Sequence, residues 1–251
     1  MTAAAEALLR AAPDETARAR LLASQKRETG EWLQAPPMSA LGLHMDNKVI
    51  RVAAGLRLGL PHKCHQCSAD VNHLGLHGLG CRKSQGWHPR HAAVNELIRK
   101  SLASAKIPSH LEPSGIMRSD GKRPDEATEM PWKNSRTMLW DATCPDNFAL
   151  SHVAHAAREA GTVTSQAERN KCQKYAFLST SHHFVPIAIE TSGVFRPEAA
   201  SFFGEPGRQI RAENGEPRSQ QFLLQGITVA VEQGNVAAVL GTAPAPGNVY
   251  V

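Results

Sequence analysis

The sequence is poor in the features that mark secreted and membrane proteins. Its five cysteines are few and unevenly spaced, which excludes the disulfide framework of a small secreted domain. No apolar segment of signal-peptide type opens the chain, and no run of about eighteen apolar residues spans a membrane. We therefore expect an intracellular protein without a membrane anchor.

Several catalytic signatures are missing as well. We find no Gly-rich phosphate loop, no Ser-His-Asp pattern, no internal repeat and no low-complexity tract. Aromatic residues make up 5% of the chain and charged residues 20%, which is ordinary for a soluble globular protein. At 251 residues the chain can bury the core of one large domain, or of a compact domain with a smaller appendage.

Acidic residues are scarce in one window of the chain. The formal net charge is +5, and the whole excess lies in residues 82–136, which hold eleven Lys or Arg against six Asp or Glu. Such a segment indicates a polyanionic partner, although an ordinary solvated surface gives a similar excess and is more common. The basic residues of this window that we select as candidate nucleic-acid contacts, together with one histidine, are Arg90, His91, Arg118, Lys122 and Arg123.

Three of the cysteines cluster with a histidine in a pattern that predicts a zinc site. Cys64 and Cys67 are separated by two residues, and His77 and Cys81 follow at knuckle-like spacing. Thiolate and imidazole ligands of this number suit a closed tetrahedral zinc ion that stabilises structure and does not catalyse. The alternatives are free cysteines in a His-rich loop, or a different fourth ligand, since His62, His65 and His73 lie close enough to compete.

The order of periodic segments predicts an α/β fold with a small mixed sheet flanked by helices. Pro13-Asp14 divides an N-terminal helical region into two helices, with Asp14 as an N-cap. Further helices are expected at residues 47–58, 88–106, 151–161, 165–178, 197–212 and 220–240, the last buried despite two glycines. Strands are expected at residues 110–112 and 183–191, with a hairpin between them.

The hairpin at residues 121–143 carries two aspartates at a suggestive spacing. If it folds symmetrically about Lys133, Asp125 lies opposite Asp141, with both side chains on one face. Two carboxylates in a small space repel unless a divalent cation lies between them, which predicts a Mg²⁺ or Mn²⁺ site. The simpler interpretation is a turn aspartate and an ordinary polar strand residue.

A basic helix follows the hairpin. Lys171, Lys174 and Tyr175 occupy positions i, i+3 and i+4 of the segment at residues 165–178, so they share one face of the expected helix.

Together these motifs resemble a known family. A Cys₂HisCys knuckle, Arg90-His91, the Arg-Pro-Asp sequence ending at Asp125, the Trp-Asp-Ala-Thr sequence containing Asp141, and a Lys-x-x-Lys-Tyr helix follow one another in this order. This order is similar to the C-terminal region of early-branching non-LTR retrotransposon polyproteins, in which a zinc knuckle precedes a restriction-enzyme-like endonuclease of the PD-(D/E)XK class. The resemblance covers about residues 42–242.

The resemblance implies a domain division and a function. Residues 1–60 would be a helical linker, 61–90 the zinc knuckle, and 91–245 a restriction-endonuclease-like domain that nicks DNA in the nucleus. The RNA of the parent element would be a second candidate partner. Asp125 and Asp141 would hold the catalytic Mg²⁺ or Mn²⁺, and a lysine would offset developing charge. The alternative is an inactive nucleic-acid-binding remnant.

The sequence departs from the family pattern at two points. Position 143, two residues after the second acid, is Thr143 and not lysine, so the catalytic lysine must be Lys171 or Lys174, with Tyr175 nearby. The polymerase box Tyr-x-Asp-Asp is absent. Glu112 and Glu190 are further acidic groups, for which we expect structural roles.

Overall fold

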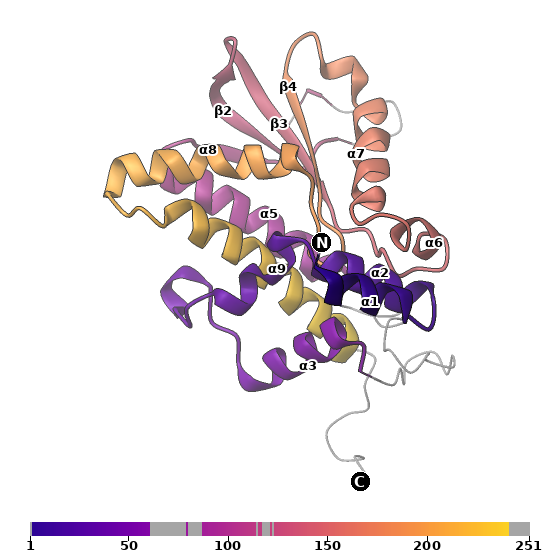
Figure 1. Ribbon diagram of the computed structural model, residues 1–251. Coiled ribbons are helices and arrows are strands. Elements are labelled where there is room, and N and C mark those ends of the chain that lie inside the picture. Colours follow the sequence, from indigo (N-terminus) through magenta and orange to yellow (C-terminus); the bar gives the residue numbers. More distant parts are fainter. Residues whose placement is uncertain are drawn as a thin grey trace.

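The computed structural model describes residues 2–60, 79, 87–113, 115–116, 121 and 123–240, and Figure 1 draws it as a ribbon. The α-helices are α1 Ala3–Arg10, α2 Glu15–Ser24, α3 Asn47–Leu58, α5 Trp87–Ser104, α6 Val153–Ala156, α7 Thr162–Lys174, α8 Pro197–Asn214 and α9 Ser219–Leu240. The 3₁₀ helices are η1 Arg27–Gln34, η2 Ser39–Leu41 and η3 Ala176–Leu178, and the strands are β1 Ser109–Leu111, β2 Glu126–Lys133, β3 Arg136–Thr143 and β4 His183–Ala188.

The N-terminal region is helical, as the sequence predicts. Pro13 and Asp14 separate α1 from α2, and the Asp14 carboxylate accepts a hydrogen bond of 2.7 Å from the amide of Ala17. Asp46 caps α3 in the same way, at 2.8 Å from the amide of Val49. A carboxylate at this position satisfies an amide that has no partner inside the helix and favours the positive end of the helix dipole.

The four strands form one small mixed sheet in the order β1-β2-β3-β4. β1, β2 and β3 pair antiparallel, whereas β4 pairs parallel to β3 and is reached through α6 and α7. A parallel neighbour requires such a crossover because the chain must return to the same end of the sheet. The predicted α/β class with a small mixed sheet and flanking helices is confirmed.

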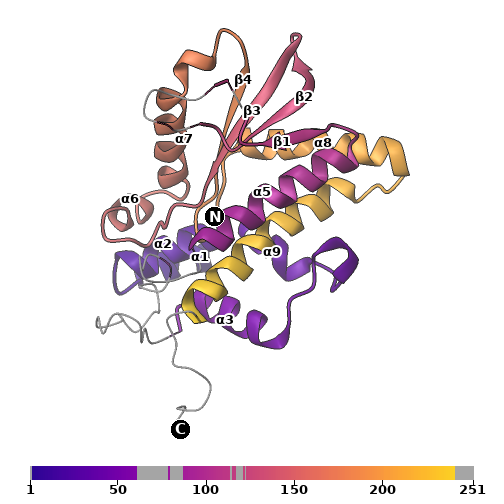
Figure 2. The ribbon, with the colours of Figure 1, turned by 180° about the vertical axis from the view of Figure 1, so that it is seen from behind.

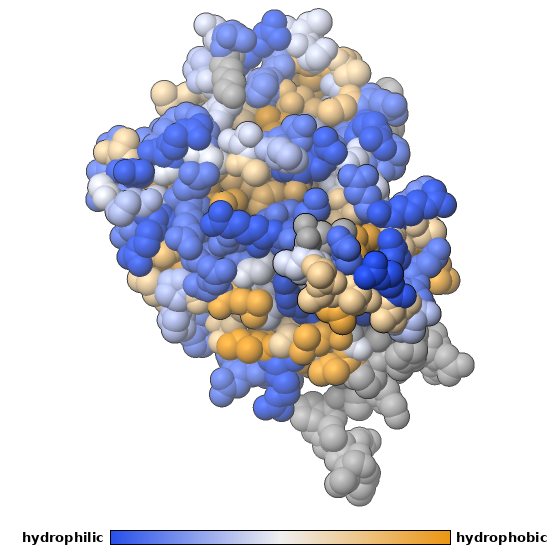
Figure 3. Space-filling model, in the orientation of Figure 1, coloured by the Kyte–Doolittle hydropathy of each residue, from blue (hydrophilic) through white to orange (hydrophobic). Residues whose placement is uncertain are grey.

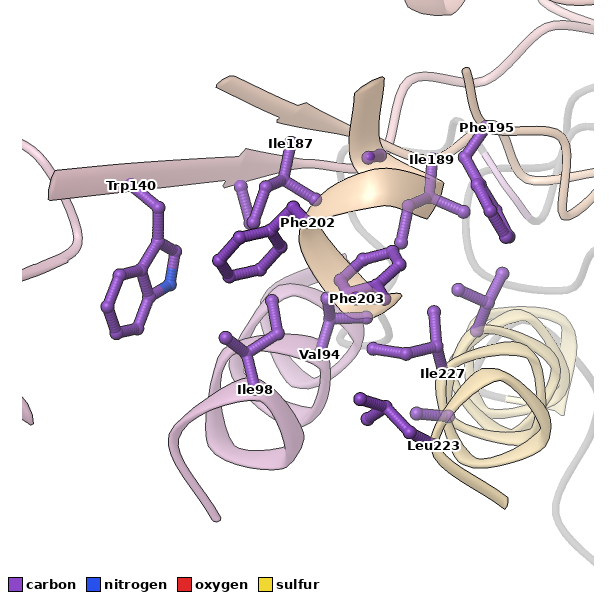
Figure 4. Packing of buried hydrophobic residues seen from close by; sticks show 14 of the residues in the cluster. Val94, Ile98, Trp140, Ile187, Ile189, Phe195, Phe202, Phe203, Leu223 and Ile227 are labelled. Carbon is purple, nitrogen blue, oxygen red and sulfur yellow. The ribbon is translucent and has the colours of Figure 1, made fainter. Parts of the chain in front are cut away.

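Helices cover both faces of this sheet (Figures 1 and 2). On one face, Trp140 and Ile187 pack against α5, α8 and α9, as Figure 4 shows from close by. On the other face, Leu139 and Ala127 pack against Tyr175 and Leu178, at and after the end of α7. Burial of each large apolar side chain stabilises the fold by about 1.5–3 kcal/mol, so both helical layers hold the sheet in place.

The hairpin turn lies at Asn134 and Ser135 and is not centred on Lys133. Both residues have positive φ angles, 51° and 57°, as a two-residue turn of the I′ type requires. Lys133 pairs with Arg136 beside the turn, and two register shifts in β2 change the pairing before Ala127 meets Leu139. The bulges compensate for the displaced turn, so the far end of the hairpin has the register that the sequence predicts.

Helix α9 lies at the centre of the molecule. It packs against α5, α8, α3 and η1, and it is long and apolar enough to cross a membrane. However, 78% of its most apolar window is buried inside the protein, which is the behaviour of a core helix. The predicted buried helix at residues 220–240 is therefore confirmed.

The surface is mainly hydrophilic in the view of Figure 3, with apolar side chains gathered in its lower part, where α3 lies. Ile50 and Leu58 of α3 are exposed, Leu58 to 72%. Single exposed apolar residues of this kind are normal.

Candidate active site

The two aspartates lie at the same end of the hairpin. Glu126 pairs with Trp140 and Ala127 with Leu139, so the predicted register holds as far as Glu126. Asp125 lies before β2, and its amide donates a hydrogen bond of 3.0 Å to the carbonyl of Trp140, the residue that Glu126 also pairs with. Asp125 therefore departs from the regular pairing, as a bulge residue does, and is not paired with Asp141 in the ladder.

Asp125 is held by three hydrogen bonds to a single oxygen. Its Oδ2 accepts from His91 Nε2 at 3.1 Å, Asn95 Nδ2 at 3.0 Å and the amide of Ala142 at 2.7 Å. His91 and Asn95 lie one turn apart on α5, so they present their side chains to the same point. The hydrogen bonds that the described residues donate to the Asp125 carboxylate all go to Oδ2.

These contacts shift the pKa values of both His91 and Asp125. Burial opposes ionisation of Asp125 and is the largest single effect on it, but the hydrogen bonds and the charge of His91 outweigh burial and lower the pKa of Asp125. The hydrogen bond to Asp125 is the largest effect on His91 and raises the pKa of its imidazole, against the opposing effect of burial. The pair therefore favours an ionised carboxylate beside a protonated imidazole.

Asp141 meets the two lysines that the sequence places on the following helix. Lys171 Nζ forms an ion pair with Asp141 Oδ1, and Lys174 Nζ lies 3.6 Å from Oδ2. The Asp141 side chain is only 5% exposed. Alternation along β3 explains the geometry, because Asp141 and Leu139 point to the face that α7 covers.

The two carboxylates turn to partners from opposite faces of the sheet, which corrects the expectation that both side chains share one face. Asp125 lies just before β2, and its carboxylate is held by α5 on the face of Trp140, whereas Asp141 is held by α7. The groups around Asp125 and those around Asp141 still interact electrostatically, since the charges of Lys171 and Asp141 both affect the pKa of His91.

A pocket of about 410 Å³ opens beside Asp125. It is lined by residues that include His91, Asn95, Glu112, Arg123 and Glu126. Glu112 and Arg123 form an ion pair at its rim, in which the side chain of Glu112 is 68% exposed, so the structural role expected of Glu112 is that of a partner to this arginine.

Glu126 lies at the inner wall of this pocket. It is fully buried, and its Oε1 has no hydrogen-bond partner among the residues that the structure describes. Burial raises the pKa of Glu126 to about 7. A carboxyl group in this state is half protonated near neutral pH, directly beside the ionised Asp125.

Two residues selected from the sequence have other surroundings than expected. Arg90 is completely buried and donates to Asn235 Oδ1 at 2.5 Å, so its position does not fit the expected contact with a phosphate. Tyr175 is 1% exposed, and its hydroxyl donates to the carbonyl of Arg123 at 2.7 Å. This phenol anchors the backbone two residues before Asp125, which fits a structural role better than a catalytic one.

Glu190 has the structural role expected of it. It is fully buried, and its Oε1 accepts from the amide of Thr164 in the first turn of α7 at 3.3 Å, while Oε2 accepts from Ser192 Oγ at 3.2 Å. It therefore fixes the start of the helix that carries Lys171.

Some predicted residues lie outside the described part of the chain. These are the proposed zinc ligands Cys64, Cys67, His77 and Cys81, and the proposed nucleic-acid contacts Arg118 and Lys122. Their assignments stay predictions.

Asn95 and Glu126 were not predicted as site residues from the sequence. Asn95 follows His91 by four residues, which places both on one helix face, so the helical period gave a usable signal. Glu126 directly follows Asp125 in an expected strand, where alternation assigns it to the opposite face. Nothing in the sequence indicated that this glutamate is buried without a full set of partners.

The donor set fits a magnesium ion only in part. In the described residues no group of three or more His, Cys, Asp or Glu side chains is arranged to hold a metal ion. Asp125 and Asp141 nevertheless supply hard oxygen donors, and Mg²⁺ commonly binds through one or two carboxylates plus water and substrate phosphate. The described residues therefore supply oxygen donors for such a site but not a formed metal cluster.

Comparison with models of protein families and with curated proteins gives no match. The function is therefore inferred from the residues and their geometry.

Proposed function

We propose that this chain is a metal-dependent DNA endonuclease domain with a restriction-endonuclease-like fold, similar to the endonuclease region of non-LTR retrotransposon polyproteins. A small mixed sheet with helices on both faces is compatible with that fold. The proposed domain follows a helical N-terminal region and a structural zinc knuckle.

One observation carries the proposal. The departure at Thr143 required the catalytic lysine to come from the next helix, thirty residues beyond Asp141, and Lys171 and Lys174 of α7 both reach Asp141. Two aspartates at one end of the hairpin and two lysines at one of them supply the charges that a phosphodiester hydrolase needs.

The residues around Asp125 and those around Asp141 have different proposed roles. A Mg²⁺ or Mn²⁺ ion bound by Asp125 and Asp141 would polarise a water molecule and the scissile phosphate. His91 and Asn95 hold Asp125 through Oδ2, the oxygen to which the described residues donate. Lys171 and Lys174 form ion pairs with Asp141 and place positive charge where the negative charge of the phosphate increases during attack.

The partners follow from this assignment. DNA is the proposed substrate, and Arg123, whose side chain is 33% exposed at the pocket rim, is the described basic residue best placed to contact its backbone. The RNA of a parent element is a further proposed partner, and the nucleus is the proposed location.

A Mg²⁺-dependent nicking assay on supercoiled plasmid tests the proposal. The isosteric change Asp141→Asn removes the charge that Lys171 and the metal share, and we expect the nicking rate to fall by about 100- to 1,000-fold. The matched control is Asp46→Asn, because asparagine is an equally good helix cap far from the site. Equal nicking by wild type and Asp141→Asn would refute the assignment.

Single changes to methionine distinguish the roles of the two lysines. Lys171 makes the closer contact with Asp141 and is the less exposed, 18% against 29% for Lys174. We expect Lys171→Met to reduce the single-turnover nicking rate by at least about tenfold more than Lys174→Met. A larger loss with Lys174→Met would reverse the assignment of roles.

The pairing of Asp141 with both lysines also favours a second candidate, a nucleic-acid-binding module that no longer cleaves. In the described residues Asp141 is neutralised by protein cations at both oxygens, which leaves less charge for a metal. Salt-dependent DNA binding without Mg²⁺-dependent nicking would identify this alternative.

A further inference from the structure

Consecutive residues of α5 point in opposite directions at the start of this helix. The His91 side chain is 42% exposed and contacts Asp125. The preceding Arg90 is fully buried and contacts Asn235 on α9. The first turn of α5 therefore connects the candidate active site to the central helix of the core.

The contact between the two helices is unusually close at this point. A Cβ atom added to Gly234 would lie 2.5 Å from Arg90 Cβ and 2.9 Å from Arg90 Cα. The backbone of α9 thus rests directly against Arg90, one residue before Asn235. Such an approach is possible only where α9 has no side chain.

Arg90 depends on Asn235 for its hydrogen bonding. Within the described part of the chain, its Nε and Nη2 are buried without hydrogen-bond partners, and its Nη1 donates to Asn235 Oδ1 at 2.5 Å. A buried guanidinium that loses its acceptor is strongly unfavourable. Without Asn235, Arg90 would move toward water and take the adjacent His91 with it.

Asn235 also holds the other side of the hairpin. Its Nδ2 donates to the carbonyl of Thr191 at 2.7 Å. The Thr191 hydroxyl in turn donates to Asp146 Oδ1 at 3.1 Å and to Asn147 Oδ1 at 3.0 Å. Asp146 and Asn147 follow β3 closely, so one amide connects α5, α9 and the segment after Asp141.

We infer that Asn235 is a positioning residue for the candidate active site, which acts through Arg90 to fix the first turn of α5 and thereby the contact of His91 with Asp125. This inference rests on the proposed endonuclease function for its effect on nicking. Its structural part, the fixing of α5 by α9, stands on the contacts alone.

Two changes at position 235 separate positioning from general stability. Asn235→Leu removes all three hydrogen bonds of the amide, to Arg90, to the Thr191 carbonyl and, at 3.4 Å, to Glu232 Oε2. Asn235→Asp keeps an acceptor for Arg90 but replaces the donor to the Thr191 carbonyl by a carboxylate oxygen. The matched control is Gln233→Leu on the same helix as Asn235. It removes an exposed hydrogen bond of 3.1 Å from Gln233 to the carbonyl of His44.

For each folded variant, single-turnover nicking at saturating DNA and the DNA dissociation constant are measured separately. We expect Asn235→Leu to nick about 10- to 100-fold more slowly with unchanged DNA affinity. Asn235→Asp and Gln233→Leu should nick within about threefold of wild type. A wild-type rate in Asn235→Leu, or an equal loss in Asn235→Asp, would overturn the inference.

Amide hydrogen exchange provides a readout that does not need nicking. In Asn235→Leu, the amides of residues 91–95 should exchange at least about tenfold faster than in Gln233→Leu, because the start of α5 is released. If wild type fails to nick, the proposed function fails but the exchange comparison still decides the inference. Equal exchange in the two variants would overturn it.

Discussion

Individual carboxyl groups in this protein differ in how their ionisation affects the stability of the fold. Asp125 accepts three hydrogen bonds at one oxygen, and its pKa is lowered. Glu126, the next residue, is fully buried, one of its oxygens has no partner in the described part of the chain, and burial raises its pKa to about 7. The first group stabilises the fold when ionised, and the second destabilises it.

The change Glu126→Gln tests this contrast. Because the folded-state pKa of Glu126 lies above its ordinary value of 4.5, wild type should lose stability as the pH rises from about 4.5 to 7. At pH 8 we expect Glu126→Gln to be more stable than wild type by about 2–3 kcal/mol, and at pH 4.5 to be nearly equal to it. Urea unfolding at several pH values measures the difference.

The exposed Glu129 on the same strand provides the control. Its side chain is 54% exposed, so Glu129→Gln should change the free energy of unfolding by no more than about 0.5 kcal/mol. A Glu126→Gln variant whose stability follows the wild-type pH curve would show that Glu126 ionises without penalty in the folded protein.

The His91–Asp125 pair has its own pH window. Protonation of His91 is favoured by folding, so its contribution is complete below an unfolded pKa of about 6.5 and is lost as the pH rises through the higher folded pKa. The ionised Asp125 contributes above its ordinary value of 3.8 and loses this contribution as the pH falls through the lower folded pKa.

At the scale of elements, the β2–β3 hairpin combines a strained turn with bulges. Ser135 has φ of 57°, in the left-handed region that costs a residue with a side chain about 1 kcal/mol. We expect Ser135→Gly to raise the free energy of unfolding by roughly this amount, measured by urea titration. Ser135→Ala keeps the strain and should give no gain, and a gain of equal size with alanine would contradict the explanation.

Close helix packing gives a second prediction at this scale. Gly234→Ala on α9 would place a methyl group against the backbone of Arg90, so we expect it to destabilise the protein by at least about 2 kcal/mol. Gly204→Ala on α8 is the control, since its added Cβ meets only the side-chain ends of Arg208 and Gln220 at 3.3 Å. Thermal unfolding compares the two, and equal effects would show that α9 can shift away.

Elements were more predictable from the sequence than the geometry of the site. Helical composition, caps and proline positions located α1, α2 and α3 because these signals are local. The segment of α9 was predicted as a helix from its long apolar run, which also suited a strand. Spacing predicted the pairing of Glu126 with Trp140 but not the irregular position of Asp125. The burial of Arg90 did not follow, because it depends on Gly234 and Asn235, which lie more than 140 positions away and carry no local signal.

At the scale of the whole molecule, the predicted zinc knuckle leads to a prediction of the zinc content. We expect one zinc ion for each chain in native mass spectrometry under reducing conditions, lost in Cys64→Ser and Cys81→Ser. His77→Ala should also lose the ion, whereas His73→Ala should keep it. Retention in His77→Ala together with loss in His73→Ala would assign the fourth ligand differently.

The central place of α9 has a consequence for biosynthesis. This helix is the last described segment to leave the ribosome, yet α3, α5, α8 and η1 all pack against it. The local hairpin that carries Asp125 and Asp141 can form early, because it closes only a short loop. The buried contact that fixes α5 cannot form until residues 219–240 have been translated. A nascent chain would therefore carry Asp125 long before α5 is fixed beside it, whereas Lys171 and Lys174 could already pair with Asp141.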